Sequence, residues 1–472
     1  MNGMHVRNQR SGTVTELQTY SDGRTSRPFP VRETIFAPAT SAGRAAVAIV
    51  RISGPACETA LRALTSDAQL SDRVASLRKL RDPETGEVLD RAIVLRFLAP
   101  RSFTAEDMAE LHITGGRAVQ KSVMKALGKI ESLRIANPGE FALRAFENGK
   151  LDLSAVEGVA DLIASETEAQ RKQAFRIADG ALSREAESIR GLLVEGMFTL
   201  EAQIDFSEAE ETESNTLDDV RRLASRAVER IRTILESAHR GERLRAGLNI
   251  VIAGPPNVGK STLMNALSRR DVSIVSPNPG TTRDLIEVAL DLDGYPVTLV
   301  DTAGIRDAQD AIEVEGIDRA RLRAQEADLT LWLAECGSTP AAIPSGIEPV
   351  MLVRTKADRA ARESESRPST RNMVHRISAR TGEGIGELLD EISDFAARQF
   401  DGGAALITAE RHRVAFLDAE AALVRALNSG QDALELLAEE LRLASWALAR
   451  IGGRIDVEDV LDGIFARLCI GK

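Results

Sequence analysis

The sequence predicts a multidomain protein with a small α+β domain, an all-α domain, and a doubly wound α/β domain that interrupts the all-α domain. At 472 residues the chain has about three times the length of a typical domain. Residues 151–247 lack strand-like runs, and their apolar residues recur at the spacing of amphipathic helices. Residues 248–400 alternate helical patterns with short apolar runs, which indicates a mainly parallel sheet. The five runs are 250–253, 297–300, 329–333, 350–353 and 374–377.

The flanking segments complete this organisation. Residues 1–32 are polar, hold five arginines against two acids and lack the apolar core of a secretory signal, so we expect a disordered tail. Residues 33–150 contain β-capable runs such as 45–52 together with helix-length stretches, which favours an α+β domain. Residues 401–472 are helical again. Together with 151–247 they suggest one helical domain split by an insert.

Composition excludes several classes of protein. Hydrophobic residues make up 43% and charged residues 28%, and no run approaches the ~18 apolar residues of a membrane span. The net charge of −11 argues against a whole-molecule nucleic-acid clamp but allows a local basic face. Cys57, Cys336 and Cys469 lie far apart and lack metal-ligand spacing, so we expect neither disulfides nor zinc, and a cytoplasmic location.

A phosphate-binding motif follows the first apolar run of the α/β domain. Residues 254–262 read GPPNVGKST and match GxxxxGK[ST] between a strand and a helix. In such a loop backbone N–H groups cradle phosphates, Lys260 reaches the β and γ phosphates, and the Ser261 hydroxyl can ligate Mg²⁺. The nucleotide-binding residues expected here are Asn257, Val258, Gly259, Lys260, Ser261 and Thr262.

Two further elements fit a nucleotide-hydrolysing site. Asp301-Thr302-Ala303-Gly304 follows the strand 297–300, where P-loop proteins hold their metal. Thr281 and Thr282 lie in a Pro- and Ser-rich stretch between the two motifs. A Thr in a mobile loop at this place can complete the Mg²⁺ shell and sense the γ-phosphate.

The base-recognition elements favour guanine. Thr355-Lys356-Ala357-Asp358 resembles the NKxD element of GTPases, and Asp358 can accept from guanine N1–H and its exocyclic amine. Thr355 replaces the usual Asn, which predicts weaker base affinity. Ser378 and Ala379 match the last guanine-contacting loop. The series resembles a translation-factor-related GTPase, and Asp358 argues against a kinase or ATPase.

One position shapes the hydrolysis mechanism. Ile305 stands where Ras-like proteins place the Gln that orients the attacking water, so another group must position it. Glu313 is the candidate, and an ordinary exposed acid at a helix start is the alternative. A monovalent cation can replace the missing arginine finger. Asn257 and the loop around Ser276 and Asn278 offer oxygen ligands for K⁺.

Taken together, the motifs along residues 33–472 resemble the tRNA modification GTPase MnmE (TrmE) family. The resemblance rests on Glu33–Ile35, Val50–Gly54, Ser102–Asp107, Asn137–Phe141, Lys150–Leu153, the GTPase motifs and Cys469–Lys472. It implies a homodimer whose N-terminal domain binds 5-formyl-tetrahydrofolate or a related tetrahydrofolate. It also implies a helical domain split by the GTPase domain (G domain), and K⁺-dependent GTP hydrolysis.

The implied activity is tRNA modification with the FAD-containing partner MnmG (GidA), in a heterotetramer. The pair would add an aminomethyl or carboxymethylaminomethyl group at C5 of the wobble uridine of certain tRNAs. By matching position, the resemblance implies folate contacts from Arg51, Glu110, Lys150 and Lys472, Mg²⁺ ligands Ser261 and Thr282, and K⁺ ligands Asn257, Ser276, Asn278 and Thr281. It gives Glu313 the water-orienting role, with Lys260 and Cys469 as further catalytic residues. An inert buried thiol is an equal alternative for Cys469.

The sequence departs from the family pattern in three glycine-containing motifs of the N-terminal region. The family's Gly-Arg-Gly-Gly reads Gly43-Arg44-Ala45-Ala46, its His-Gly-Gly reads Thr114-Gly115-Gly116, and Ala105 replaces a Gly. These departures bear on folate affinity. The rival function is a regulatory GTPase switch that binds RNA or ribosome without modification chemistry. The N-terminal domain and the Cys-Ile-Gly-Lys terminus favour the enzyme.

Overall fold

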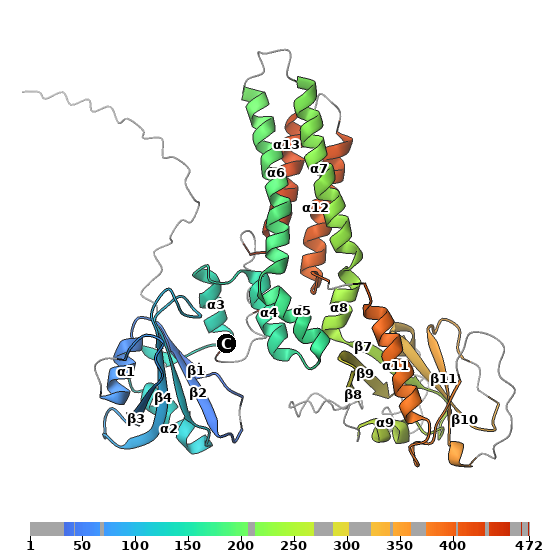
Figure 1. Ribbon diagram of the computed structural model, residues 1–472, viewed down its shortest axis with the longest axis horizontal. Coiled ribbons are helices and arrows are strands. Elements are labelled where there is room, and N and C mark those ends of the chain that lie inside the picture. The colour runs from blue at the N-terminus through green and yellow to red at the C-terminus, as the bar shows by residue number, and fades with distance from the viewer. Residues whose placement is uncertain are drawn as a thin grey trace, which may run out of the picture. The chain divides into compact units, whose positions relative to one another are not determined.

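The computed structural model divides the chain into two compact units (Figure 1). The described residues are 33–41, 43–66, 70–205, 213–268, 287–301, 322–339, 343–359, 374–402, 405–429, 434–453, 464 and 471. The first unit runs to Ser102 and resumes at Glu106–Ala136, and the second holds Phe103–Ala105 and the chain from Asn137. The expected tail, residues 1–32, lies outside the described residues. Within the described part, no helix is both long and apolar enough to cross a membrane.

The N-terminal unit is a mixed sheet with two helices. Its six strands lie in the order β3-β4-β5-β2-β1-β6, and only β1 and β6 pair in parallel. The elements are β1 (Thr34–Pro38), β2 (Val47–Ser53), α1 (Cys57–Thr65), β3 (Ser76–Arg81), β4 (Val88–Phe97), β5 (Met108–Thr114), α2 (Arg117–Leu127) and β6 (Leu133–Ile135). This is the α+β architecture that the sequence predicts.

Alternation along the strands gives this sheet two different faces. Val50, Leu111 and Leu127 are fully buried in one core with α1 and α2. On the opposite face Leu77 of β3 stands beside Ile93 of β4, and their side chains are 66% and 43% exposed. Because successive strand residues alternate in direction, the two faces follow from the period of two in the sequence.

The helical domain contains segments from both ends of the second unit. Besides α3 (Glu140–Glu147), the helices of this unit outside the insert are α4 (Leu153–Ala164), α5 (Glu168–Ala178), α6 (Ala181–Asp205), α7 (Glu213–Glu236), α8 (Ala238–Ala246), α12 (Glu410–Asn428) and α13 (Leu434–Ala449), and these form the helical domain. Figure 1 shows α6, α7, α12 and α13 side by side, and one apolar core joins Leu193, Ile231, Phe416 and Leu441. The prediction of a helical domain interrupted by an α/β domain is confirmed.

A buried ionic cluster links α4 to α12. Glu157 accepts hydrogen bonds from Arg411 at 2.6 and 2.5 Å, and its Oε2 lies 2.7 Å from His412 Nε2. Burial alone would raise the pKa of Glu157, but the hydrogen bonds from His412 and Arg411 outweigh it and lower the pKa from 4.5 to about 2. Burial lowers the pKa of His412. Because ionised Glu157 can only accept, neutral His412 carries its proton on Nε2.

Side-chain caps and close helix contacts support the cluster. Asp152 caps α4 by accepting from the Ala155 N–H at 2.9 Å. Gly158 brings α4 close to α5, since a Cβ there would lie 2.3 Å from the Ala178 nitrogen. Asp161, one turn further along α4, pairs with Arg245 of α8 at 2.8 Å. The short α4 therefore contacts both parts of the split domain.

The inserted domain is a doubly wound sheet, as predicted. Its strands lie in the order β12-β11-β10-β7-β9-β8, and all neighbours are parallel except β8 and β9. The elements are β7 (Leu248–Ala253), α9 (Lys260–Ser268), β8 (Glu287–Leu292), β9 (Tyr295–Asp301), β10 (Leu329–Glu335), β11 (Val350–Thr355), η2 (Ala357–Arg359), β12 (Val374–Arg376) and α11 (Ile385–Phe400). Strand β8 is absent from the predicted runs because it lies at the sheet edge and alternates acids with apolar residues.

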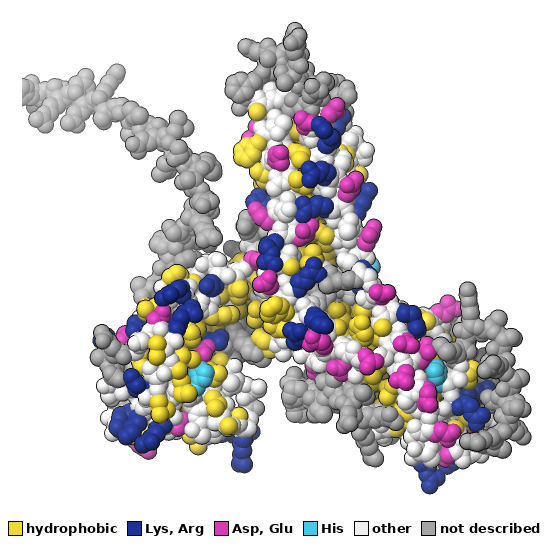
Figure 2. All heavy atoms as spheres, viewed as in Figure 1, with side chains coloured by type: hydrophobic (Ala, Val, Ile, Leu, Met, Phe, Trp, Pro, Cys, Tyr) yellow, Lys and Arg dark blue, Asp and Glu magenta, His cyan; other side chains and the backbone are white. Residues whose placement is uncertain are grey.

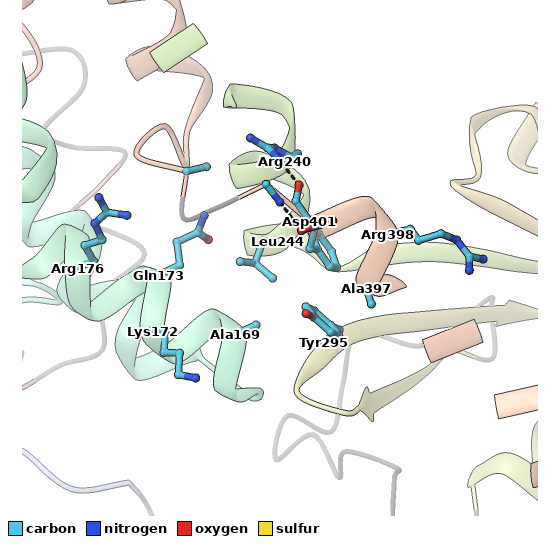
Figure 3. A pocket seen from close by; sticks show the side chains of 13 residues that line it. Ala169, Lys172, Gln173, Arg176, Arg240, Leu244, Tyr295, Ala397, Arg398 and Asp401 are labelled. Carbon is cyan, nitrogen blue, oxygen red and sulfur yellow. Dashed lines mark hydrogen bonds between the residues drawn. The ribbon is translucent and has the colours of Figure 1, made fainter. Parts of the chain in front are cut away.

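A cavity of about 560 Å³ lies where α5, α8, the β8–β9 hairpin and α11 approach one another (Figure 3). Gln173, Leu244 and Tyr295 line it, and the Tyr295 ring stacks on Phe400 with centroids 5.4 Å apart. The Ala169 N–H donates to the Gly294 carbonyl at 3.1 Å beside it. The hairpin that leads into β9 therefore contacts the helical domain directly.

Candidate functional site

The phosphate loop between β7 and α9 has backbone requirements that its residues meet. Gly254 has φ of +145°, and a Cβ there would lie 2.5 Å from the Leu333 carbonyl oxygen, so only glycine fits. Asn257 adopts φ of +62°, in the left-handed region that Asn tolerates. Gly259 has φ of +108°. The helix then begins at Lys260, which directs its first N–H groups toward the loop.

The polar groups of the loop form one cluster with the end of β9. Lys260 Nζ donates to the carbonyls of Gly254 at 2.8 Å and Pro255 at 3.0 Å. Ser261 Oγ donates to Oδ2 of the fully buried Asp301 at 3.0 Å. A hydroxyl beside a carboxylate offers the oxygen ligands that Mg²⁺ prefers. The structure thus brings together the two motifs that the sequence places forty residues apart.

Thr355 connects the base-recognition loop to the phosphate loop. It is buried at the end of β11, and its hydroxyl lies 2.6 Å from the Val258 carbonyl and 3.4 Å from that of Ala334. A hydroxyl has one proton, so the shorter contact to Val258 is the stronger hydrogen bond. The Thr at this position therefore stabilises the phosphate loop, a role that the sequence motif alone does not reveal.

Asp358 is held ready to accept hydrogen bonds. Ser378 Oγ donates to its Oδ1 at 2.7 Å, and this bond lowers the pKa of the Asp358 carboxyl. The adjacent Lys356 has φ of +59° and pairs with Glu335 at 2.8 Å. The two predicted base-contacting loops therefore meet through a direct side-chain bond.

A cavity of about 470 Å³ lies beside these loops. Thr262 and Asn265 of α9 line one side, and Ala379 and Arg380 line the other. Thr262 and Ala379, both predicted to contact nucleotide, therefore border the same space. The remaining predicted residues of this site lie outside the described residues: Ser276, Asn278, Thr281, Thr282, Thr302, Ala303, Gly304 and Glu313.

A second polar group lies on the open face of the N-terminal sheet. Arg51 of β2 is directly opposite Glu110 of β5, with Nη2 3.0 Å from Oε1. Nε2 of His112 is 3.4 Å from the other carboxylate oxygen of Glu110. The sequence motifs do not include His112, although its place two residues after Glu110 puts it on the same face of the strand. All three side chains remain partly exposed.

The other residues predicted to contact folate are not brought to this pair within the unit. Lys150 belongs to the second unit, where its N–H donates to the Ala145 carbonyl at 2.8 Å. Lys472 and Cys469 lie outside the described residues. Of the other cysteines, Cys57 is buried, and burial raises the pKa of its thiol, which favours the unreactive form.

The glycine departures have structural explanations. Ala105 has φ of +61°, a conformation that costs an L-residue about 1 kcal/mol and that the family's Gly adopts freely. Ala45, in the altered Gly43–Ala46 motif, lies against Gly115. A Cβ on Gly115 would lie 2.3 Å from the Ala45 carbonyl oxygen, so only glycine fits at position 115, and the chain keeps it. The N–H of Ala45 donates to the Gly115 carbonyl, and the N–H of Gly115 donates to the Ala46 carbonyl, each at 3.3 Å.

Two family models and several relatives match nearly the whole chain. A family model for the MnmE helical domain matches residues 153–469, and one for the GTP-binding protein TrmE N-terminus matches residues 34–150. The tRNA modification GTPase MnmE of Beijerinckia indica subsp. indica is 52% identical, over 93% of this chain and 96% of the relative. That of Methylobacterium sp. (strain 4-46) is 49% identical, over 93% of this chain and 100% of the relative.

Among solved structures, the G domain of the T. maritima FeoB iron transporter is 27% identical over 32% of this chain and 98% of that chain, with a TM-score of 0.22. The assignment rests instead on the sequence relatives, which share about half of their residues with this chain over almost their full length. The word GTPase in their names fits the phosphate loop and Asp301 described above, and the helical-domain family model spans both parts of the split helical domain. The chain belongs to the MnmE family of tRNA modification GTPases.

Proposed function

We propose that this tRNA modification GTPase is K⁺-dependent and works with the FAD-containing partner MnmG (GidA). The pair installs an aminomethyl or carboxymethylaminomethyl group at C5 of the wobble uridine of certain tRNAs, with a tetrahydrofolate as one-carbon donor. The observation that carries the proposal is the paired Arg51 and Glu110 on the N-terminal sheet of a chain that also holds a GTPase site. A regulatory switch that only binds RNA or ribosome has no need of such a second site.

In the nucleotide site, residues 257–262 take the phosphates, and the ammonium of Lys260 moves from the loop carbonyls to the β and γ phosphates. Ser261, Asp301 and Thr282 fit a Mg²⁺ ion, which neutralises phosphate charge when bound. Thr302, Ala303 and Gly304 follow Asp301 at the γ-phosphate. Ser276 and Thr281 contribute from the loop after α9.

Base selection falls to Asp358, Ser378 and Ala379, with Lys356 beside them. We predict that Asp358→Asn lowers GTP affinity about 100-fold or more, because two charge-assisted hydrogen bonds to guanine are lost. The same variant should gain hydrolysis of xanthosine triphosphate, whose 2-carbonyl accepts from the new amide. Competition binding and hydrolysis assays with both nucleotides measure this.

Asp390→Asn is the matched control for that experiment. Asp390 is exposed on α11 and should leave nucleotide preference unchanged. If Asp358→Asn kept the wild-type preference for GTP, the assignment of the base-recognition loop would be wrong.

Hydrolysis depends on a monovalent cation and a positioned water. Asn257, Ser276, Asn278 and Thr281 supply oxygen ligands for K⁺, whose charge takes the place of an arginine finger. Glu313 orients the attacking water, since Ile305 has no hydrogen-bonding group.

We therefore predict faster GTP hydrolysis in KCl than in NaCl, and a loss of about 10²-fold or more in kcat for Glu313→Ala. Glu387→Ala, an exposed acid in the first turn of α11, should retain wild-type rates in both salts. Equal rates in the two salts would refute the cation, and a wild-type rate for Glu313→Ala would refute the water-orienting role. Steady-state phosphate release measures both.

The folate site combines opposite charges. Glu110 can accept from the N–H groups of a pterin ring, and Arg51, Lys150 and Lys472 can pair with glutamate carboxylates. This mixture of charges supports the proposal of a tetrahydrofolate, which would supply the one-carbon unit when bound. Cys469, three residues before Lys472, is the proposed reactive thiol beside this group.

Homodimer formation has a suitable surface on the same N-terminal unit. Val47, Leu77 and Ile93 are 52%, 66% and 43% exposed on the open sheet face that also carries Arg51. Leu77 and Ile93 are direct cross-strand neighbours, and exposed apolar residues on one sheet face support a protein contact there. We accordingly assign residues 33–150 to folate binding and dimerisation, 151–247 and 401–472 to the helical domain, 248–400 to GTP, and the protein to the cytoplasm.

Analysis of tRNA nucleosides tests the modification itself. A strain that lacks the gene should lose the C5-modified wobble uridine, and the wild-type gene should restore it. Glu110→Ala should fail to restore the modification while retaining GTP hydrolysis, whereas Glu87→Ala, an exposed acid in the β3–β4 turn, should restore it. Unchanged wobble nucleosides in the deletion strain would overturn the proposed reaction and favour the regulatory switch.

A further inference from the structure

Helix α2 carries a stripe of positive charge. Arg117, Lys121 and Lys125 follow one another at intervals of four, and the helix contains no acidic residue. Residues four apart share one face of a helix, about 6 Å apart along its axis. All three side chains are exposed, while Val123 and Leu127 on the other side are fully buried in the core of the sheet. We call these three residues the α2 stripe.

The stripe does not stabilise the helix that carries it. Like charges four residues apart repel each other and lower helix stability. Arg117 also occupies the first position of α2, where a positive charge opposes the helix dipole. These unfavourable interactions indicate that the charges serve a contact outside the helix.

Several cations of this unit pair with carboxylates, and the described ion pairs do not include the stripe. The described ion pairs of the unit use Arg51, Arg62, Arg96, Arg101, Lys129 and Arg134. The comparison with Lys129 is direct, since it continues the same spacing beyond Lys125. Its ammonium lies 3.1 Å from Asp82 and 2.7 Å from Glu84. Among the described residues, no carboxylate pairs with the stripe in this way.

The charge balance of the unit points the same way. Residues 33–136 hold fifteen Lys and Arg against twelve Asp and Glu, although the whole chain has a net charge of −11. Figure 2 shows Lys and Arg side chains on the visible face of this unit. The N-terminal unit is thus a locally basic part of an acidic protein.

We propose that the α2 stripe binds the phosphate backbone of the tRNA substrate. The inference rests on the proposed function and adds a place of contact to it. Evenly spaced cations suit a backbone that repeats one negative charge per nucleotide. Since α2 lacks aromatic residues for base stacking, the contact positions the RNA without reading its sequence. The stripe lies on the helix-covered side of the sheet, so it remains accessible when the open face forms the proposed dimer.

The test compares two triple variants of the full-length chain. The first is Arg117→Gln with Lys121→Gln and Lys125→Gln, which removes the stripe and keeps good helix formers. The matched control is Arg62→Gln with Arg171→Gln and Arg442→Gln. It removes the same charge from exposed arginines that already pair with a neighbouring Glu. The probe is an unmodified tRNA transcript, titrated at several KCl concentrations.

For the stripe variant we expect the affinity for the tRNA transcript at about 0.1 M KCl to fall by about tenfold or more. The slope of log K against log KCl concentration should become smaller in magnitude by about 2 to 3. The control should retain the wild-type affinity and slope. Circular dichroism and the GTP hydrolysis rate report folding, and Lys121→Gln alone provides a milder variant with a slope reduced by about 1.

If the wild type binds tRNA and the stripe variant binds it equally well, the inference is overturned and the proposed function stands. If the stripe variant binds tRNA as well as the wild type but no longer binds an acidic protein partner, the inference is overturned and the stripe belongs to that partner. If the wild-type chain itself shows no affinity for tRNA, the inference falls together with the claim that this chain touches tRNA.

Discussion

The buried contact of Glu157 with Arg411 and His412 joins the two halves of the split helical domain. Glu157 lies on α4 and its partners on α12, 254 and 255 residues later in the chain. Taking these charges out of water is costly, and removing one partner of such a cluster leaves the others uncompensated. The lowered pKa of Glu157 shows that its ionised form is the stable one in this site. The two halves of the helical domain are therefore held together by a specific ionic contact as well as by their shared apolar core.

The packing of the helical domain also fixes the two points at which the chain leaves it for the inserted G domain and returns from it. A Cβ on Gly241 of α8 would lie 2.0 Å from the Ile407 carbonyl oxygen. The segment that precedes the G domain and the segment that follows it are therefore in direct contact. Insertions are tolerated where the ends of the inserted domain lie close together. From there β9 runs from Tyr295, beside the cavity in Figure 3, to Asp301 at the phosphate loop. One short strand thus connects the helical domain with the nucleotide site.

The grouping of the described G-domain loops was predictable because these loops follow strand ends in a fixed order. The phosphate loop, Asp301 and Ser378 come directly after an apolar run and Asp358 lies in the turn after β11, and parallel strands bring their carboxyl ends to one edge of the sheet. The hydrogen bond of Thr355 to Val258 was not predictable, since it depends on the turn of a loop 97 residues away. Strand β8 was missed because its alternation of acids and apolar residues is typical of an exposed edge.

The Glu157 cluster leaves no comparable signal in the sequence. No local period relates residues on α4 and α12, and a single Glu or His in a helix is most often on the surface. His112 was missed for a different reason. Its role depends on Glu110, whose pairing across strands with Arg51 becomes visible only with the register of β2 and β5. Long-range polar pairing is the part of this structure that the sequence pattern does not predict.

Urea unfolding of Glu157→Gln tests the importance of the cluster most directly. A Trp332→Phe background leaves Trp446 of α13 as the only tryptophan, so fluorescence reports on the helical domain. We expect Glu157→Gln to lower the free energy of unfolding by about 3 kcal/mol, because Arg411 and His412 lose a buried carboxylate. Glu168→Gln, which breaks the exposed pair with Arg171, should cost less than about 1 kcal/mol. Equal and small losses for both variants would contradict the dependence of the split domain on this cluster.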